Sequence, residues 1–161
     1  MYKENDIVVY RKDVCKIIGI KKINELDYYI MNKLDDSSLT ITIPINSNLI
    51  RKVITKKEAE NIINQIPNIK PLKNIDDKYM ESKYKELLHN GSYEDLITII
   101  KSAYLRNSNR IKNSKRVSER DTKYFDLAEK YLYTELSIAL DMTIDETQNY
   151  IINKVEQLIN N

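Results

Sequence analysis

Residues 49–66, with the sequence LIRKVITKKEAENIINQI, mark a change of secondary structure in this 161-residue chain, because their hydrophobic pattern changes from that of a strand to that of a helix. Thr55 and Glu58 stand three residues apart, which is the spacing of a capping box at the start of a helix. An apolar stripe at helical spacing follows, made of Ile62, Ile63 and Ile66. We therefore expect the chain to change from strands to helices near Ile54.

The part before this change, residues 1–54, is predicted to form a small antiparallel β domain. Three segments are short and rich in β-branched or aromatic residues: DIVVYR (6–11), VCKIIGIKKI (14–23) and DYYIMNKL (27–34). In LTITIP (39–44), Leu39, Ile41 and Ile43 alternate with threonines, as in a half-buried strand. Four or five strands without an intervening helix indicate a small barrel or a strongly bent sheet.

The part after the change, residues 55–161, is predicted to form a bundle of about four helices. The sequence leaves open whether the first helix packs with this bundle or with the strands. PNIKPLKNIDD (67–77) has two prolines and is interpreted as a linker. The next helix is expected to end at Gly91, which suits a left-handed residue at a helix C-terminus. Three later helix starts show cap spacing, namely Ser92 with Asp95, Ser118 with Asp121, and Thr143 with Glu146. The predicted fold class is therefore α+β.

Composition argues against most catalytic classes. Two glycines are too few for a glycine-rich phosphate loop, and one cysteine with one histidine provides neither a disulfide framework nor a zinc site. Cys15 lies in an apolar strand pattern and is interpreted as a buried structural residue, and His89 as a residue of a last helical turn. We expect no enzyme activity, cofactor, metal or small-molecule substrate. With no apolar signal region or membrane-length segment, we expect a cytoplasmic protein without membrane contact.

Residues 104–121, YLRNSNRIKNSKRVSERD, are called the basic stretch below. Between Lys101 and Lys123 there are eight basic and two acidic residues, although the whole chain has a net charge of only +2. The basic stretch is predicted to be a polar interruption between two helices. From its charge alone, the basic stretch is equally well interpreted as a solvated linker and as a surface that contacts nucleic acid. Twelve tyrosines would suit base stacking, but the spacing of Tyr124, Leu127 and Tyr131 favours a position between helices.

The order of motifs resembles a known family. NDIVVYRKDVCKIIGI, DYYIM, LTITIP and IRKVITKKEA resemble the N-terminal domain of the CarD/CdnL family of bacterial transcription regulators, which is shared with the RNA-polymerase-interacting module of transcription-repair coupling factor. LLHNGSYEDLITIIKSAYLR and SERDTKYFDLAEKYLYTEL resemble the helical domain of that family. The resemblance covers nearly all of the chain. It implies a Tudor-like domain that binds the RNA polymerase β subunit, and a helical domain that contacts promoter DNA and stabilises the open complex.

The resemblance also implies site residues. The polymerase-binding set is Lys21, Lys22, Thr40, Thr42 and Pro44, although the basic residue of the family strand is replaced here by Thr42. The tryptophan that members of the family wedge into the minor groove falls near Ile75, and this chain has no tryptophan. Phosphate contact is therefore expected to depend on basic residues. With Ile75, the DNA-binding set is Lys78, Arg106, Arg110, Lys112, Lys115, Arg116 and Lys123.

A second function stays open at this point. The chain would then be an adaptor that binds RNA polymerase through its sheet and another protein through its helices, without contacting DNA. The missing tryptophan favours this alternative. Neither the direction of regulation nor the oligomeric state follows from the sequence.

Overall fold

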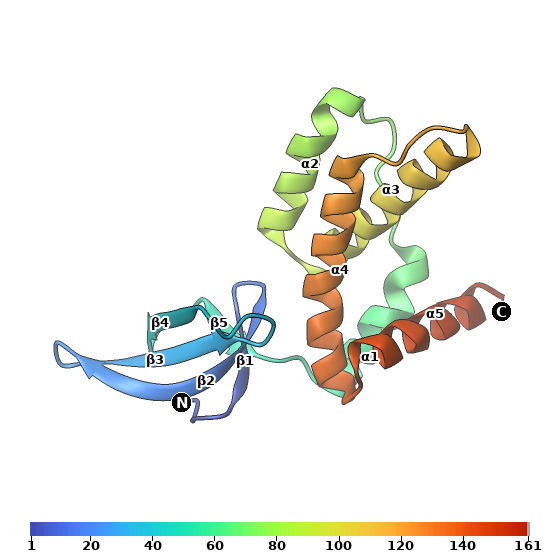
Figure 1. Ribbon diagram of the computed structural model, residues 1–161. Helices are drawn as coiled ribbons and strands as arrows, with labels where there is room; N and C mark the ends of the chain where they lie inside the picture. The colour runs from blue at the N-terminus through green and yellow to red at the C-terminus, as the bar shows by residue number, and fades with distance from the viewer. Residues whose placement is uncertain (161) are drawn as a thin grey trace. The chain divides into compact units, whose positions relative to one another are not determined.

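A computed structural model describes residues 1–160, and the chain divides into two compact units between Ile54 and Thr55 (Figure 1). The first unit contains β1 (Ile7–Tyr10), β2 (Asp13–Ile23), β3 (Leu26–Lys33), β4 (Thr40–Pro44) and β5 (Ile50–Lys52). The second contains α1 (Lys56–Gln65), the short 3-10 helix η1 (Ile66–Asn68), α2 (Asp77–Asn90), α3 (Tyr93–Lys112), α4 (Glu119–Leu140) and α5 (Ile144–Asn160). The predicted α+β class is confirmed.

The five strands form one antiparallel sheet in the order β4-β3-β2-β1-β5. Its core consists of Val8, Cys15, Ile17, Tyr29, Met31 and Ile43. The predicted antiparallel sheet is confirmed, but closure into a barrel is not. The described strands β4 and β5 each have one neighbour in the sheet, so the sheet is open at both ends. Leu39 differs from its predicted position on the apolar face, because it precedes β4 and is 57% exposed.

Two tight turns in the sheet place residues other than glycine in the left-handed region. Arg11, between β1 and β2, has a φ of 58°, and its N–H donates to the carbonyl oxygen of Leu49 at 2.9 Å. Asn24 and Glu25 join β2 to β3 with φ values of 48° and 69°. Positive φ at both central residues is typical of the type I′ turn, whose twist matches that of the flanking strands. The turns therefore form without the glycines that usually occupy such positions.

In the helical unit, all the predicted caps are confirmed. Complete capping boxes start α1 at Thr55 and α3 at Ser92. The Ser118 hydroxyl accepts from the Asp121 N–H at 3.2 Å, and the Thr143 hydroxyl accepts from the Glu146 N–H at 3.1 Å. Gly91 ends α2 with a φ of 66°, as predicted.

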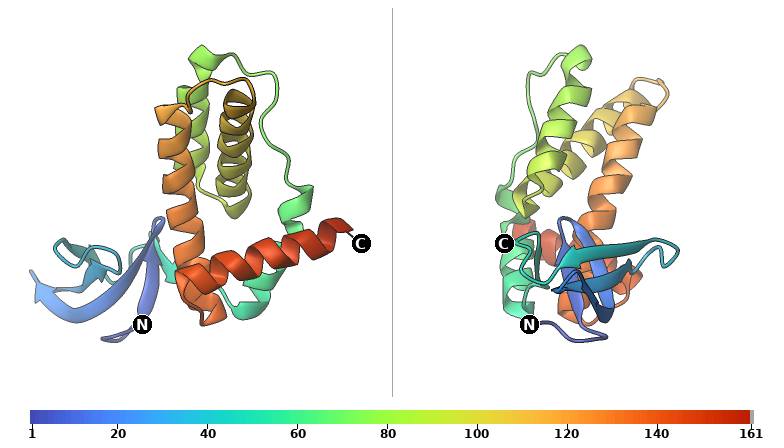
Figure 2. Two further views of the ribbon diagram at one scale, coloured as in Figure 1. Left: turned by 45° about the vertical axis from the view of Figure 1, so that its right-hand side comes forward. Right: turned by 90° about the vertical axis from the view of Figure 1, so that its left-hand side faces the viewer.

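The helices of the second unit pack in two groups. α2, α3 and α4 lie side by side, and α5 packs against α1, η1 and α4 (Figure 2). The buried faces of α2, α3 and α4 contribute Tyr84, Ile99, Tyr124 and Leu132 to the core. The first helix, α1, packs against α4 and α5, so it belongs with the other helices. No described helix combines the length and the apolar character needed to cross a membrane.

The basic stretch is not the interruption that the sequence predicted, because α3 continues through Lys112. The helix ends when Ser114 adopts a φ of 57°. The Ser114 N–H donates to the Ile111 carbonyl at 3.0 Å, and the Lys115 N–H to the Arg110 carbonyl at 2.7 Å. This pair of hydrogen bonds is a Schellman motif. Only the residues between α3 and α4 are irregular, so most of the basic stretch is a rigid helical surface.

Candidate functional site

A buried carboxylate joins the three helices α2, α3 and α4. Asp121, in the first turn of α4, has no exposed surface. It accepts a hydrogen bond from the Tyr84 hydroxyl at 2.9 Å and one from Arg106 Nε at 3.3 Å. Arg110 also donates to it through Nη1. Burial, followed by the hydrogen bond to Asp121, raises the pKa of Tyr84 well above its usual value. Asp121 thus serves as an internal counter-ion that fixes the orientation of α3.

A second carboxylate, that of Asp77, contacts the same arginines from the first turn of α2. Arg120 Nη2 lies 2.8 Å and Arg110 Nη2 3.5 Å from Asp77 Oδ1, and Arg106 Nη2 also donates to this oxygen. The Asp77 side chain is nevertheless 68% exposed. The hydrogen bond from Arg120 lowers the pKa of Asp77 below its usual value. We call this group the arginine cluster; it consists of Arg106, Arg110, Arg120, Asp77 and Asp121.

The side chain of Asn107 fixes the start of α4 beside the end of α3. Its Oδ1 accepts from the Ser118 N–H at 2.8 Å and from Arg110 Nη1 at 3.0 Å. Its Nδ2 donates to the Thr122 hydroxyl at 3.2 Å. These bonds hold the connecting residues in place, which explains why a polar segment without an apolar stripe remains helical.

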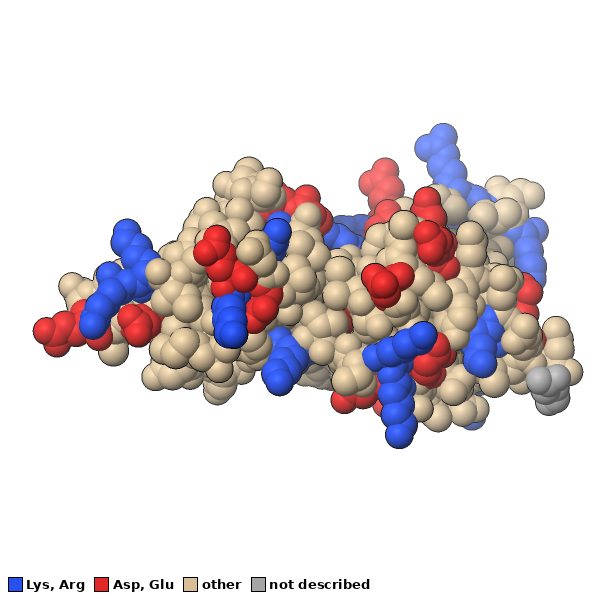
Figure 3. All heavy atoms as spheres, turned by 90° about the horizontal axis from the view of Figure 1, so that it is seen from below, with Lys and Arg blue, Asp and Glu red and all other residues tan. Residues whose placement is uncertain are grey.

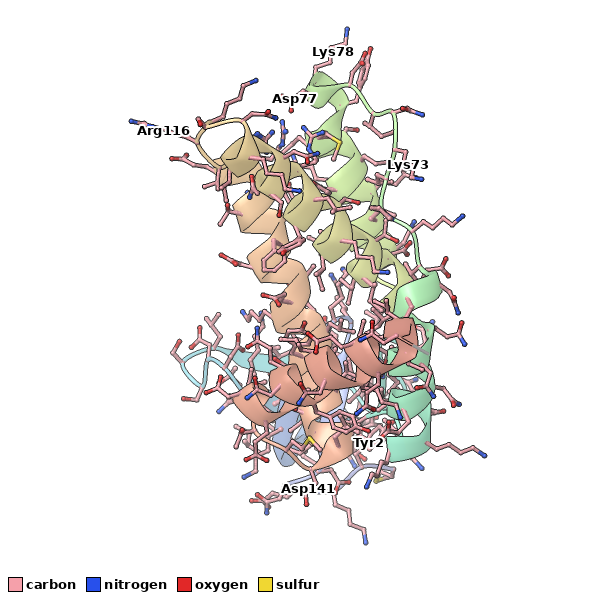
Figure 4. All side chains as sticks on the ribbon, turned by 90° about the vertical axis from the view of Figure 1, so that its right-hand side faces the viewer. Tyr2, Lys73, Asp77, Lys78, Arg116 and Asp141 are labelled. Atoms are coloured by element: carbon pink, nitrogen blue, oxygen red, sulfur yellow. The ribbon has the colours of Figure 1, made fainter. Side chains whose placement is uncertain are left out.

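Basic side chains surround the arginine cluster. Lys112, Lys115 and Arg116 are exposed, and no ion pair found among residues 1–160 involves them. We call these three residues the basic rim. Arg116, Asp77 and Lys78 lie at the same end of the helical unit (Figure 4). By contrast, the face of the molecule in Figure 3 carries interspersed charges of both signs.

Two further residues of the predicted DNA-binding set are exposed beside tyrosines. The Lys78 ammonium lies 5.1 Å from the centre of the Tyr79 ring, and that of Lys123 lies 5.3 Å from the Tyr124 ring. Tyr79 is 57% exposed, whereas Tyr124 is buried. Lys123 therefore keeps its charge at the surface of a packed helix, and Lys78 lies next to an exposed aromatic ring.

Other members of that set are less available than the sequence suggested. Arg106 and Arg110 are engaged by Asp77 and Asp121, and Ile75 is half-buried. Lys101, which contributed to the local charge, donates to the carbonyl oxygens of the η1 region instead, and burial lowers its pKa. The positive surface is consequently smaller than the count of basic residues predicted. The sequence alone did not identify Asp77 and Asp121 as the ion-pair partners of these arginines. Their places in the first turns of α2 and α4 were visible in the sequence.

In the N-terminal unit, β4 provides a partner-binding candidate. Thr40, Thr42 and Pro44 are exposed, whereas Ile43 between them is buried in the sheet core. The outer edge of β4 has no neighbouring strand among the described residues. Lys21 and Lys22 are exposed near the end of β2. An open edge offers unpaired backbone donors and acceptors to another extended chain.

The described residues contain little that resembles a catalytic centre. Burial raises the pKa of the Cys15 thiol to about 11, which leaves it protonated and unreactive near neutral pH. Among residues 1–160, no group of three or more histidine, cysteine, aspartate or glutamate side chains is placed to hold a metal ion. The guanidinium and ammonium groups of the arginine cluster and the basic rim are suited to binding anions.

No protein-family model matches the chain, and no curated protein matches it. The resemblance to the CarD/CdnL family therefore stays a prediction from the order of motifs.

Proposed function

We propose that this protein is a bacterial transcription regulator of the CarD/CdnL type, which binds the RNA polymerase β subunit through its N-terminal unit and promoter DNA through its helical unit. The observation that carries the proposal is the outer edge of β4, which has no neighbouring strand among the described residues and belongs to a different unit from the basic rim. The order of motifs along the chain supports it. In this proposal the open sheet is a variant of the Tudor-like fold.

Polymerase binding would use strand addition at β4. An extended segment of the β subunit would pair with the β4 backbone, and the outward Thr40 and Thr42 side chains would contact it. Edge pairing derives its affinity from main-chain hydrogen bonds, so it does not require the basic residue that Thr42 replaces. Lys21 and Lys22 would add electrostatic attraction to an acidic surface, which mainly speeds association.

DNA binding would use phosphate contacts made by the basic rim, with Lys78 and Lys123 alongside. Each neutralised phosphate releases counterions, so this contact weakens as salt rises. The affinity of so few charges is small. Attachment to polymerase raises the effective concentration of the helical unit at the promoter, to roughly the millimolar range when the linker is short and flexible. A weak phosphate contact is then sufficient to lengthen the lifetime of the open complex.

The polymerase interaction is tested with two substitutions at one position of the full chain. Thr42→Asp places a charge on the β4 edge, and we expect it to reduce capture of RNA polymerase by about tenfold or more, because the charge would be desolvated in the new sheet. Thr42→Val keeps a β-branched side chain of similar size and should bind like the original protein. Equal binding of all three proteins would contradict docking at β4.

The DNA contact is tested by replacing Lys112, Lys115 and Arg116 together with alanine. We expect a shorter open-complex lifetime at moderate salt with polymerase binding unchanged, since the three exposed side chains contribute positive charge and take part in no ion pair found among residues 1–160. A control with the same loss of charge replaces the exposed Lys56, Lys57 and Lys70. If both triple variants behave alike, the basic rim has no specific role at the promoter.

The adaptor function is a second candidate, and one observation favours it. Arg106 and Arg110 are already paired with Asp77 and Asp121, which leaves fewer free cations than a dedicated DNA-binding surface usually has. An electrophoretic shift of a polymerase–promoter complex separates the two functions. A DNA-contacting regulator changes the salt sensitivity of the complex, whereas an adaptor binds polymerase without changing it.

A further inference from the structure

We infer that the arginine cluster is a phosphate-binding site that Asp77 occupies in the free protein, and that a phosphate of the nucleic-acid backbone binds there by displacing the Asp77 carboxylate. The inference rests on the proposed function only for the source of the phosphate. The site itself follows from the contacts among Arg106, Arg110, Arg120 and the two carboxylates.

The geometry converges on one point. Side-chain nitrogens of three arginines from two helices approach the same oxygen, Asp77 Oδ1, with Arg120 Nη2 at 2.8 Å and Arg110 Nη2 at 3.5 Å. Arginine binds phosphate well because its planar donors match the phosphate oxygens. The oxygen of Asp77 therefore occupies the position that a phosphate oxygen would take.

The two carboxylates of the cluster differ in how firmly they are held. Asp121 is fully buried and receives a hydrogen bond from Tyr84, so it stays in place and keeps Arg106 and Arg110 oriented. Asp77 is 68% exposed and can turn into solvent. Water competes for the exposed Asp77 carboxylate, which weakens its ion pairs with the less exposed arginines. Displacement of Asp77 is thus the favoured route by which an anion enters.

Loss of the Asp77 contact would break no capping hydrogen bond at the start of α2. The N-cap residue is Asp76, whose side chain makes no capping hydrogen bond, and Asp77 adds a negative charge in the first turn. The Asp77 side chain thus contacts the arginines without being required for the helix.

The arginine cluster has a net positive charge and an N–H donor that makes no hydrogen bond. Its three guanidiniums and two carboxylates leave one net positive charge, which becomes two next to the anion when Asp77 turns away. Arg120 Nε is buried and lies 3.7 Å from Asp121 Oδ1, and it makes no hydrogen bond among the described residues. The first turns of α2 and α4 also direct the positive ends of their helix dipoles to this region.

The position of the cluster favours a phosphate that belongs to a polymer. Arg116 of the basic rim and Lys78 lie at the same end of the helical unit as Asp77 (Figure 4). A nucleic-acid backbone can contact the rim with one phosphate and the cluster with another. Free phosphate offers only the cluster contact, so the two sources differ in their dependence on the rim.

The test compares Asp77→Asn with Asp76→Asn in the full chain. Both variants remove one negative charge from adjacent exposed positions, but only Asp77 contacts the arginines. Binding of a short DNA duplex and of inorganic phosphate is measured by titration at fixed salt. We expect Asp77→Asn to bind the duplex roughly three- to tenfold more tightly than Asp76→Asn, because the competing carboxylate is gone. Asp77→Ser, another small polar substitution, should give the same gain.

The outcomes separate this inference from the proposed function. Equal duplex binding by the two variants, lost when the basic rim is replaced, would overturn the inference and leave the DNA contact intact. Phosphate binding gained by Asp77→Asn without any duplex binding would support the anion site and overturn the nucleic acid as its source. If Asp77→Asn and Asp77→Ser gain affinity for neither probe while their circular dichroism is unchanged, the site does not exist.

Discussion

Replacement of Asp121 by alanine should strongly destabilise the helical unit. The substitution leaves the hydroxyl of Tyr84 without its acceptor and removes the buried counter-ion of Arg106 and Arg110. Removal of one partner from a buried ion pair costs about 3–5 kcal/mol, of which an orphaned hydroxyl accounts for ~1–3 kcal/mol. Because Arg106 and Arg110 keep the Asp77 contact, we expect the lower part of this range, about 3 kcal/mol.

The assay is urea unfolding of the full chain, followed by helical circular dichroism, which reports the second unit. Asp126→Ala is the matched control, because Asp126 is an exposed carboxylate on the same helix, and it should change the free energy of unfolding by no more than about 0.5 kcal/mol.

Tyr84→Phe provides a double-mutant cycle with Asp121→Ala. Alone it should cost about 1 kcal/mol, and in the Asp121→Ala background close to none, because the acceptor is already absent. The reasoning would be refuted by a loss below about 1 kcal/mol for Asp121→Ala, or by strictly additive effects of the two substitutions.

Three further predictions concern other parts of the chain. Gly91→Ala should lower the free energy of unfolding by about 1 kcal/mol in the same urea assay, because Gly91 has a φ of 66°, and Gly91→Asn should cost less. Burial and the bond to Glu81 raise the pKa of Tyr124 to about 12, from 10.0 in the unfolded chain. Its contribution to stability should therefore be complete below pH 10 and be lost as the pH rises towards 12, and Tyr124→Phe should remove this part of the alkaline loss in urea titrations at several pH values. Cys15, with a thiol pKa of about 11 and no exposed surface, should react with a thiol reagent only after unfolding; rapid labelling of the native protein would contradict this.

The helix starts could be predicted from the sequence because capping is local. A hydroxyl at the cap and the backbone N–H three residues later meet whatever the rest of the chain does. Thr55, Ser92, Ser118 and Thr143 each accept a hydrogen bond from the backbone N–H three residues on. The end of α2 at Gly91 is local for the same reason, since it depends on one backbone conformation.

The end of α3 could not be predicted in this way. The helix ends at Lys112, and the left-handed conformation that follows it is adopted by Ser114, a residue type that rarely takes it. The preceding polar turns lack an apolar stripe, and they stay helical because Asn107, Arg106 and Arg110 bond to α4. Contacts between helices thus outweigh the local pattern.

Some features of the candidate site could be predicted from the sequence, and others depend on tertiary contacts. The positive charge of residues 104–121 is visible in the sequence, as is the alternation that places Thr40 and Thr42 on the outer side of β4. The pairing of that charge is not visible, because Asp77 and Asp121 lie 44 residues apart and share arginines of α3 only when α2 and α4 both pack against α3.

By itself, therefore, the sequence determined the strand and helix segments, their caps and the local balance of charge, all of which depend on neighbours within a few residues. Tertiary structure alone decided whether the sheet closes, where α3 ends and which arginines remain free. These features depend on contacts between distant segments, because the free energy of an ion pair or a hydrogen bond depends on burial. Burial is in turn set by elements that are distant in the chain.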